Sequence, residues 1–144
     1  MLRSLYIASL SAYLFVLLAL LVAHKHPAYR PVSDRYNIVP FRSITRDIPK
    51  GGRGLWLNIV GNIAAFAPLG LLVYALRGSR TSIWHAALTS SALSIMAELV
   101  QFQSGRRYSD IDDVFLNTLG GAAGYAAALA VGVLSHRRRP PVAV

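Results

Sequence analysis

Four long apolar segments limit what this chain can fold into more than any other feature of its sequence. They cover residues 5–23, 55–76, 82–102 and 114–134 of 144. Each supplies about the 20 residues that an α-helix needs to cross a hydrocarbon core about 30 Å thick. Because a soluble domain of this size rarely carries four such segments, we predict an all-α integral membrane protein. The expected architecture is a four-helix bundle over residues 1–136, followed by a basic, disordered tail over 137–144.

The first apolar segment has a second interpretation, because Arg3 followed by an apolar stretch is also how a secretory signal peptide begins. The segment is longer than the usual apolar core of a signal peptide, and the "AHKHP" that follows is a poor cleavage site. We therefore favour a membrane span for this segment.

The basic charge of the chain lies in the connections and ends around the apolar segments. With 15 Lys and Arg against 6 Asp and Glu, the net charge is +9. Membrane topology and anionic lipid head groups explain this pattern better than a nucleic-acid partner does. The side that holds both termini carries its arginines in short flanks, at positions 3, 77, 80 and 137–139. Because the positive-inside rule weighs short flanks most, we predict a cell-membrane protein with four spans and both termini in the cytoplasm.

Polar side chains concentrate at three helix ends that share one membrane face, because consecutive helices alternate in direction. They are Asn58 and Asn62 on the second helix, Ser91, Ser94, Glu98 and Gln101 on the third, and Asp113 and Asn117 on the fourth. Their spacing places each set on one helical face. Facing lipid would be costly for such groups, so we expect them to face one another or a wet cavity. Hydrogen bonds that only hold the bundle together are the alternative, which we prefer for the serines.

Glu98 is the polar residue for which we favour a functional role. It lies roughly one helical turn inside the expected membrane boundary, where a carboxylate is a functional hypothesis by default. Arg106 and Arg107 follow in a loop that is short enough to fold back over it, and a nearby arginine keeps a carboxylate ionised. We expect Glu98 and Arg107 to be coupled across the mouth of the site. A salt bridge that merely closes the bundle is the alternative.

The "DIDD" at 110–113 allows two interpretations. Oxygen-rich aspartate clusters suit hard cations such as Mg²⁺, but acidic residues also cap helix N-termini and complement the helix dipole. We favour capping of the fourth helix, by Asp110 or Asp112, together with ion pairing. Since the chain contains no cysteine, disulfides and thiolate metal sites are excluded. We expect neither a bound metal nor a cofactor.

The connection over residues 24–54 is too long for a simple connector and too interrupted by proline to form one helix. Its mixture of basic and aromatic residues is typical of a segment that lies over the membrane interface. We therefore expect it to cap the polar site. A solvated loop is an equal alternative for the part after Phe41.

Several motifs in order resemble the VanZ-like family of bacterial membrane proteins. They are "NIVPF" (37–41), "NIVGNIAAFAPLG" (58–70), "AELVQ" (97–101) and "RYSDIDDVFLNTLGGAAGY" (107–125). The chain departs from the family at one position. Members often have glycine directly before the arginine that matches Arg107, and this chain has Arg106 there. The family's recurring polar positions match residues that we predict to bind a ligand: Asn37, Asn58, Asn62, Glu98, Gln101, Arg107, Asp110, Asp113 and Asn117. The family takes its name from a protein associated with reduced susceptibility to the glycopeptide antibiotic teicoplanin.

Three functions fit these residues. The first is a polar site at the outer leaflet that is presented to an envelope lipid or lipid-linked precursor, or to a glycopeptide. Arginine can bind phosphate in a bidentate manner, and asparagine can bind sugars or amides. The second is a Mg²⁺-dependent enzyme of lipid head groups, with Glu98, Arg107 and Asp113 as the candidate catalytic residues. Glu98 would be the general base and Arg107 would stabilise phosphate, while Asp110, Asp112 and Asp113 would hold Mg²⁺. The third is a structural membrane subunit whose G-x-x-x-G pair, Gly120 and Gly124, forms an oligomer contact.

Overall fold

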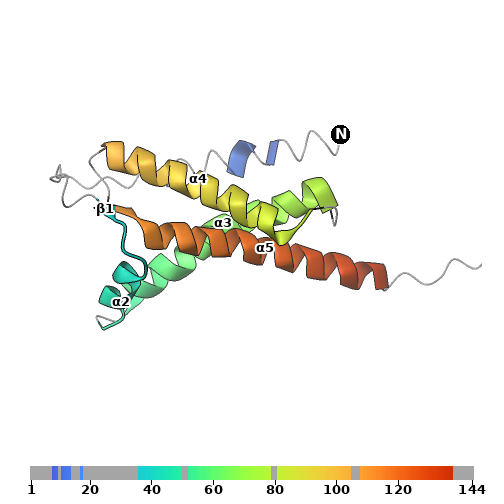
Figure 1. The fold of residues 1–144 in the computed structure, drawn as a ribbon. Helices are drawn as coiled ribbons and strands as arrows, with labels where there is room; N and C mark the ends of the chain where they lie inside the picture. Colours follow the sequence, from blue (N-terminus) through green and yellow to red (C-terminus); the bar gives the residue numbers. More distant parts are fainter. Residues whose placement is uncertain are drawn as a thin grey trace, which may run out of the picture.

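The computed structural model describes residues 36–49, 52–78, 81–104 and 108–137, together with 8, 9, 11–13 and 17. In chain order its elements are β1 (Tyr36–Asn37), α2 (Arg42–Asp47), α3 (Arg53–Arg77), α4 (Ile83–Ser104), β2 (Ser109–Asp110) and α5 (Ile111–Arg137) (Figure 1). The described chain is therefore mostly helical, which confirms the all-α prediction. The strands are a small departure from it.

Three helices are long and apolar enough to cross a membrane. They are Arg53–Arg77, Ile83–Gln103 and Ile111–Leu134. These ranges match the second, third and fourth apolar segments to within a few residues, so three of the four predicted segments are confirmed as helices that are long and apolar enough to cross a membrane. Fewer than half of the residues of each helix are buried, and large apolar side chains such as Trp84, Leu88 and Val131 lie on their outer faces. Outer faces of this kind match a lipid solvent, in which the backbone groups must be satisfied within the helix.

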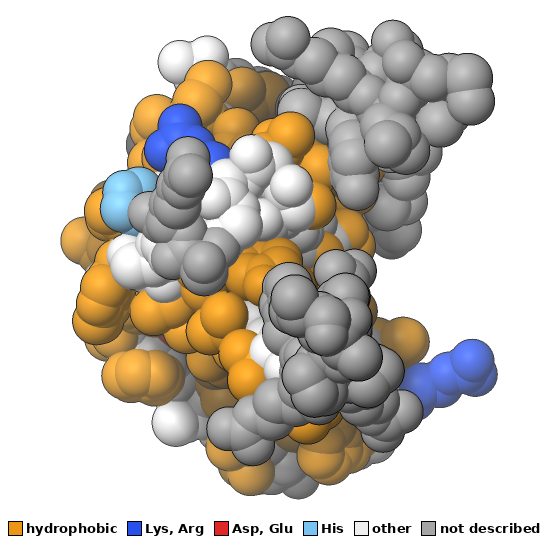
Figure 2. Space-filling model, turned by 90° about the vertical axis from the view of Figure 1, so that its right-hand side faces the viewer, with side chains coloured by type: hydrophobic (Ala, Val, Ile, Leu, Met, Phe, Trp, Pro, Cys, Tyr) orange, Lys and Arg blue, Asp and Glu red, His pale blue; other side chains and the backbone are white. Residues whose placement is uncertain are grey.

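Figure 2 views the molecule from the end opposite β1, so that the helices point toward the reader. Hydrophobic side chains dominate the flanks on this face, and only a few basic and histidine side chains are visible. The apolar surface is therefore not confined to one patch, as it would be at a protein–protein contact. Exposed large apolar side chains occur on α3, α4 and α5.

The first apolar segment is described at only six positions, which are helical where the structure describes them. Leu17 is buried there against Phe66 and Leu69 of α3. The hydroxyl of Tyr13 donates a hydrogen bond to the backbone carbonyl of Ala65, with an oxygen–oxygen distance of 2.6 Å. These contacts place part of the segment against α3. The rest of the predicted first span, and the tail after Arg137, lie outside the described residues.

The α3 and α5 helices run parallel and pack more extensively than any other pair. Their backbones meet at the G-x-x-x-G pair: a Cβ atom added at Gly120 would overlap the carbonyl of Ile63, and one added at Gly124 would overlap the carbonyl of Ala67. The predicted close approach of another helix is thus confirmed, and that helix is α3 of the same chain. Because this face is filled internally, it does not offer the oligomer contact that the structural-subunit hypothesis assigned to it.

The α4 helix runs antiparallel to both and packs on α5. Ser90 of α4 sits against Gly121 of α5, and Asn117 donates from Nδ2 to the hydroxyl of Ser94 over 2.8 Å. Small residues and one amide therefore hold this contact. The expected hydrogen bond between helices is confirmed for Ser94. Among the described groups, the Ser90 hydroxyl and Asn117 Oδ1 are buried without a hydrogen-bond partner.

Candidate functional site

The end of the bundle near β1 gathers the start of α3, the end of α4 and the start of α5 (Figure 1). Here β1 pairs in parallel with β2, with Tyr36 opposite Ser109 and Asn37 opposite Asp110. The first connection is thus tied directly to the entrance of α5. Tyr36 also contacts Phe102 at the end of α4, edge to face, with ring centroids 5.9 Å apart. This pairing closes the end of the bundle.

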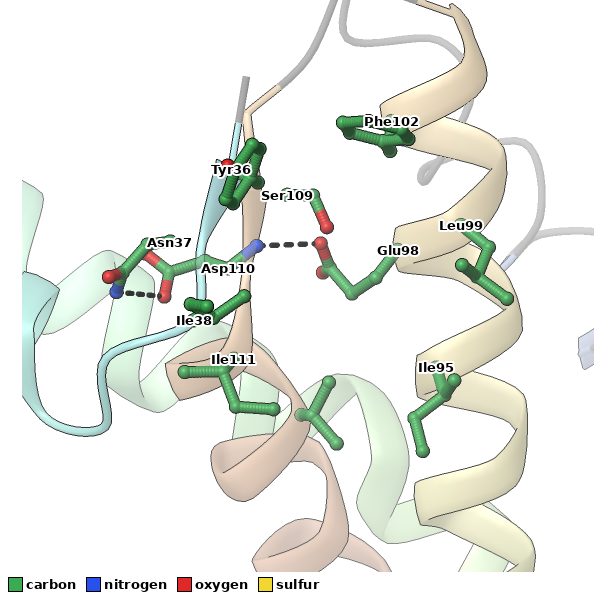
Figure 3. A pocket seen from close by; sticks show the side chains of 11 residues that line it. Tyr36, Asn37, Ile38, Ile95, Glu98, Leu99, Phe102, Ser109, Asp110 and Ile111 are labelled. Carbon is green, nitrogen blue, oxygen red and sulfur yellow. Dashed lines mark hydrogen bonds between the residues drawn. The ribbon is translucent and has the colours of Figure 1, made fainter. Parts of the chain in front are cut away.

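Glu98 points from α4 toward the first residues of α5 (Figure 3). It is only 8% exposed, and its Oε2 atom accepts a hydrogen bond of 2.8 Å from the backbone N–H of Asp110. A hydrogen bond within a folded protein typically contributes about 0.5–1.5 kcal/mol to stability. Glu98 therefore anchors β2 to α4, so its carboxylate has a structural contact within the chain.

Asp110 connects three elements through its carboxylate. It accepts from Asn37 Nδ2 at 2.9 Å and from the Ser43 hydroxyl. It also accepts from the backbone N–H of Asp112 at 3.0 Å, which is the side-chain cap expected at the start of a helix. The prediction that Asp110 or Asp112 caps the fourth apolar helix is confirmed for Asp110.

Asp112 caps a different helix from the predicted one. It is fully buried, and its carboxylate accepts from three backbone N–H groups at the start of α2: Phe41 at 2.5 Å, Ser43 at 2.8 Å and Ile44 at 3.3 Å. Phe41 has a left-handed backbone, with φ of 63°, which is uncommon outside glycine. Its ring stacks on Phe115 of α5 with centroids 5.7 Å apart. Asp112 and Phe115 together hold the first connection on α5.

A separate set of polar groups joins α3 to α5. Asn62 donates from Nδ2 to Asn58 at 3.0 Å and to Asp113 at 2.8 Å. These residues are half-buried, and they link the two helices just before the glycine contact begins. The predicted polar stripes on the second and fourth apolar helices therefore meet each other.

A cavity of about 310 Å³ lies between the end of α4 and the paired strands. Most of the side chains around it are apolar, and Glu98 projects among them (Figure 3). The residues that line it are Tyr36, Asn37, Ile38, Ile95, Glu98, Leu99, Phe102, Ser109, Asp110, Ile111 and Val114. Ile95 and Leu99 lie on a helix that can cross a membrane and are about half exposed.

The family of the chain follows from a comparison with protein-family models. The model described as VanZ/LLP1 matches residues 6–133, which include β1, α2, α3, α4, β2 and nearly all of α5. The chain belongs to the VanZ/LLP1 family. Comparisons with curated proteins and with solved structures gave no match.

The predicted site residues of this VanZ/LLP1 chain form more than one group. Asn37, Glu98 and Asp110 meet at the cavity, whereas Asn58, Asn62 and Asp113 meet between α3 and α5. Asn117 lies at the Ser94 contact, and Gln101 is buried near the end of α4. Arg106 and Arg107 lie outside the described residues, so their coupling to Glu98 stays a prediction.

The shared Mg²⁺ site of the enzyme hypothesis is not formed by the three aspartates. Asp110 faces Asn37 and Ser43, Asp112 faces the backbone of α2, and Asp113 faces Asn62 on α3. Among the described residues, no group of three or more His, Asp or Glu side chains could hold a metal ion. The physical reason is that consecutive residues on a helix point in different directions.

Sequence reasoning missed Ser43 and the role of Asp112. Ser43 is 3% exposed and contacts both Asp110 and Asp112. The available signal was a serine two residues after "PF", but this pattern does not indicate which carboxylate the serine would contact.

Proposed function

We propose that this protein presents its β1 end, at the outer leaflet of the bacterial cell membrane, to an envelope lipid or a lipid-linked precursor. The observation that carries the proposal is the cavity beside Glu98. Its apolar walls suit a hydrocarbon chain, and its polar edge suits a head group, as small-molecule sites usually combine an apolar lining with a few polar groups. The family name supports a further step, in which occupancy of this site lowers susceptibility to teicoplanin-type glycopeptides.

The proposal includes a fourth span and an orientation. Contacts of Tyr13 and Leu17 with α3 support the first apolar segment as a helix beside it. With four spans both termini lie on one side, and the short arginine-rich flanks favour the cytoplasm for that side. The β1 end then faces outward, where envelope precursors are used.

Single cysteines can test this orientation, because the natural chain has none. We expect Thr45→Cys, on the exposed face of α2, to react with a membrane-impermeant thiol reagent on intact cells. Ser82→Cys, at the start of α4, should react only after lysis. The opposite labelling pattern would place the β1 end in the cytoplasm and contradict the proposal.

Lipid binding is tested by mass spectrometry of the lipids that co-purify with the protein. We expect one envelope lipid class to be enriched with the wild type and reduced at least about fivefold with Glu98→Gln, in which the amide oxygen can still accept from Asp110. Leu88→Ala, on the exposed outer face of α4, is the matched control and should retain the lipid. The same three proteins should be expressed in cells and compared for teicoplanin susceptibility.

We expect the wild type and the control to protect cells from teicoplanin. Glu98→Gln should lose this protection at an equal yield of folded protein. If all three proteins carry the same lipids and cells expressing them are equally susceptible, the cavity has no role in lipid presentation.

The alternative function is that of an enzyme that converts a lipid head group in a Mg²⁺-dependent manner. No observation on the described residues favours it.

A further inference from the structure

Exposed aromatic side chains mark the β1 end of the bundle. Phe41, directly before α2, stacks on Phe115 of α5, and the two rings are 58% and 44% exposed. Trp56, in the first turn of α3, is 66% exposed. Phe115 and Trp56 both belong to helices that can cross a membrane, and only residues 48–52 separate α2 from α3 (Figure 1). Since aromatic rings concentrate where such helices meet the membrane–water interface, these rings place that interface at the level of Phe41.

Two exposed arginines lie next to these rings. Arg42 follows Phe41 directly at the start of α2, and Arg53 begins α3, three residues before Trp56. Both side chains are exposed, and neither forms an ion pair with a residue that the structure describes. At a rise of about 1.5 Å per residue, Arg53 lies roughly 4.5 Å farther toward the end of the bundle than Trp56. A group at that position reaches the head-group layer if Trp56 lies at the interface. Arg46 is exposed as well but has another contact within the chain, so we assign it no ligand.

The acidic side chains described at this end are turned inward. They are Glu98, Asp110 and Asp112, which are buried, and Asp113, which is partly buried and accepts a hydrogen bond from α3. The outer surface around Arg42 and Arg53 therefore combines apolar rings with positive charge, as far as the structure describes it. An anionic phospholipid complements both features, because its chains are apolar and its phosphate is negative.

We infer that Phe41, Arg42, Arg53 and Trp56 form a docking surface for anionic phospholipid. The two rings lie among the upper parts of the lipid chains, and the two arginines bind phosphate in the head-group layer. Arginine suits this contact because its guanidinium can donate two parallel hydrogen bonds to phosphate. The docking surface is separate from the cavity beside Glu98, so it goes beyond the proposed function and does not depend on it.

Trp56 can report which lipids contact the docking surface. The chain has two tryptophans, so Trp84→Phe leaves Trp56 as the single fluorophore of a parent protein. The parent is placed in nanodiscs that contain phosphatidylcholine and phosphatidylglycerol in a fixed ratio, with bromine on the chains of one lipid or of the other. We expect phosphatidylglycerol to be enriched at least about fivefold over phosphatidylcholine beside Trp56, because one arginine near an anionic surface contributes about that factor.

Arginine variants test whether the preference comes from the docking surface. The double variant Arg42→Gln with Arg53→Gln should reduce the enrichment to less than about twofold. Arg77→Gln is the matched control, because Arg77 is exposed at the other end of α3, and it should keep the enrichment of the parent. Inorganic phosphate should not displace the lipid when it is compared with chloride at equal ionic strength, since free phosphate has no apolar part to contact the rings.

A second reporter tests the depth of the first connection without changing any arginine. Phe41→Trp is made together with Trp56→Phe and Trp84→Phe, so that the fluorophore stands at position 41. We expect brominated lipid to quench it and acrylamide in the water to quench it at least about threefold less than free tryptophan. This measurement remains valid if the double arginine variant folds poorly.

Equal quenching of the parent by the two brominated lipids would overturn the inference, as would an unchanged enrichment in the double arginine variant or its loss in Arg77→Gln. Displacement by inorganic phosphate would instead indicate a site for free phosphate. Quenching of the Phe41→Trp reporter by acrylamide and not by lipid would place position 41 in water, where a soluble partner and not a lipid would cover it. None of these variants changes a residue that lines the cavity beside Glu98, so each of these failures leaves the proposed function standing.

Discussion

Replacing Asp112 with alanine is expected to release the first connection from α5. The carboxylate is fully buried and accepts from the backbone N–H groups of Phe41, Ser43 and Ile44. Its loss leaves these three donors without their acceptor, and hydrogen bonds to charged groups contribute typically about 1.5–3 kcal/mol each. Because their contributions are not additive, we expect the free energy of unfolding to fall by about 3 kcal/mol in total.

The release of α2 can be measured directly by limited proteolysis in detergent. Arg42 and Arg46 lie on the exposed surface of α2, so trypsin should cleave there at least about tenfold faster in Asp112→Ala than in the wild type. Asp112→Asn retains one carbonyl oxygen and should give an intermediate rate. Asp113→Ala is the matched control, since Asp113 faces Asn62 on α3 and should leave cleavage in α2 unchanged. Equal cleavage and equal melting temperatures for Asp112→Ala and the wild type would refute this role.

The membrane helices could be predicted from the sequence because lipid imposes a simple length rule. A span must satisfy its own backbone and cover the hydrocarbon core, so α3, α4 and α5 each appear as a long apolar run. The direction of these helices then brings Asn62 to Asp113 and Glu98 to Asp110, at one end of the bundle. Helix direction determines which helix ends lie together, but it does not determine the individual partners.

The partners of the individual aspartates could not be predicted in the same way. Asp110 obeys the local rule, because a cap contacts its own helix two residues later. Asp112 instead contacts a helix of six residues that is distant in sequence, and its partner is set by the tertiary position of the first connection. The two-residue strands β1 and β2 are also too short to give a periodic pattern. For Glu98, an intramembrane carboxylate indicated a special role, but not that its partner would be a backbone N–H.

The largest effect of any substitution in the helices is expected at the contact between α3 and α5. A side chain at Gly120 or Gly124 would overlap the carbonyls of Ile63 and Ala67, which belong to the backbone and cannot rotate away. The helices would have to separate, so the packing along their whole contact would be lost. Overpacking typically costs about 1–3 kcal/mol for each site, and the double variant Gly120→Leu with Gly124→Leu should therefore prevent folding.

Thermal unfolding and gel filtration in detergent can check this expectation, with a matched control in α3. Gly61 lies in a helix as well, but a Cβ atom there meets nothing within 4 Å, so Gly61→Leu should preserve the wild-type elution volume and melting temperature. Single Gly124→Ala should lower the melting temperature by several degrees, because even a methyl group overlaps the carbonyl of Ala67. If Gly124→Ala changes the oligomeric state and leaves the stability of the monomer unaltered, the glycine face would contact a second chain and the packing of α3 on α5 described above would be wrong. Loss of stability without a change in oligomeric state is the result that the structure requires, since it puts the glycine face inside a single bundle.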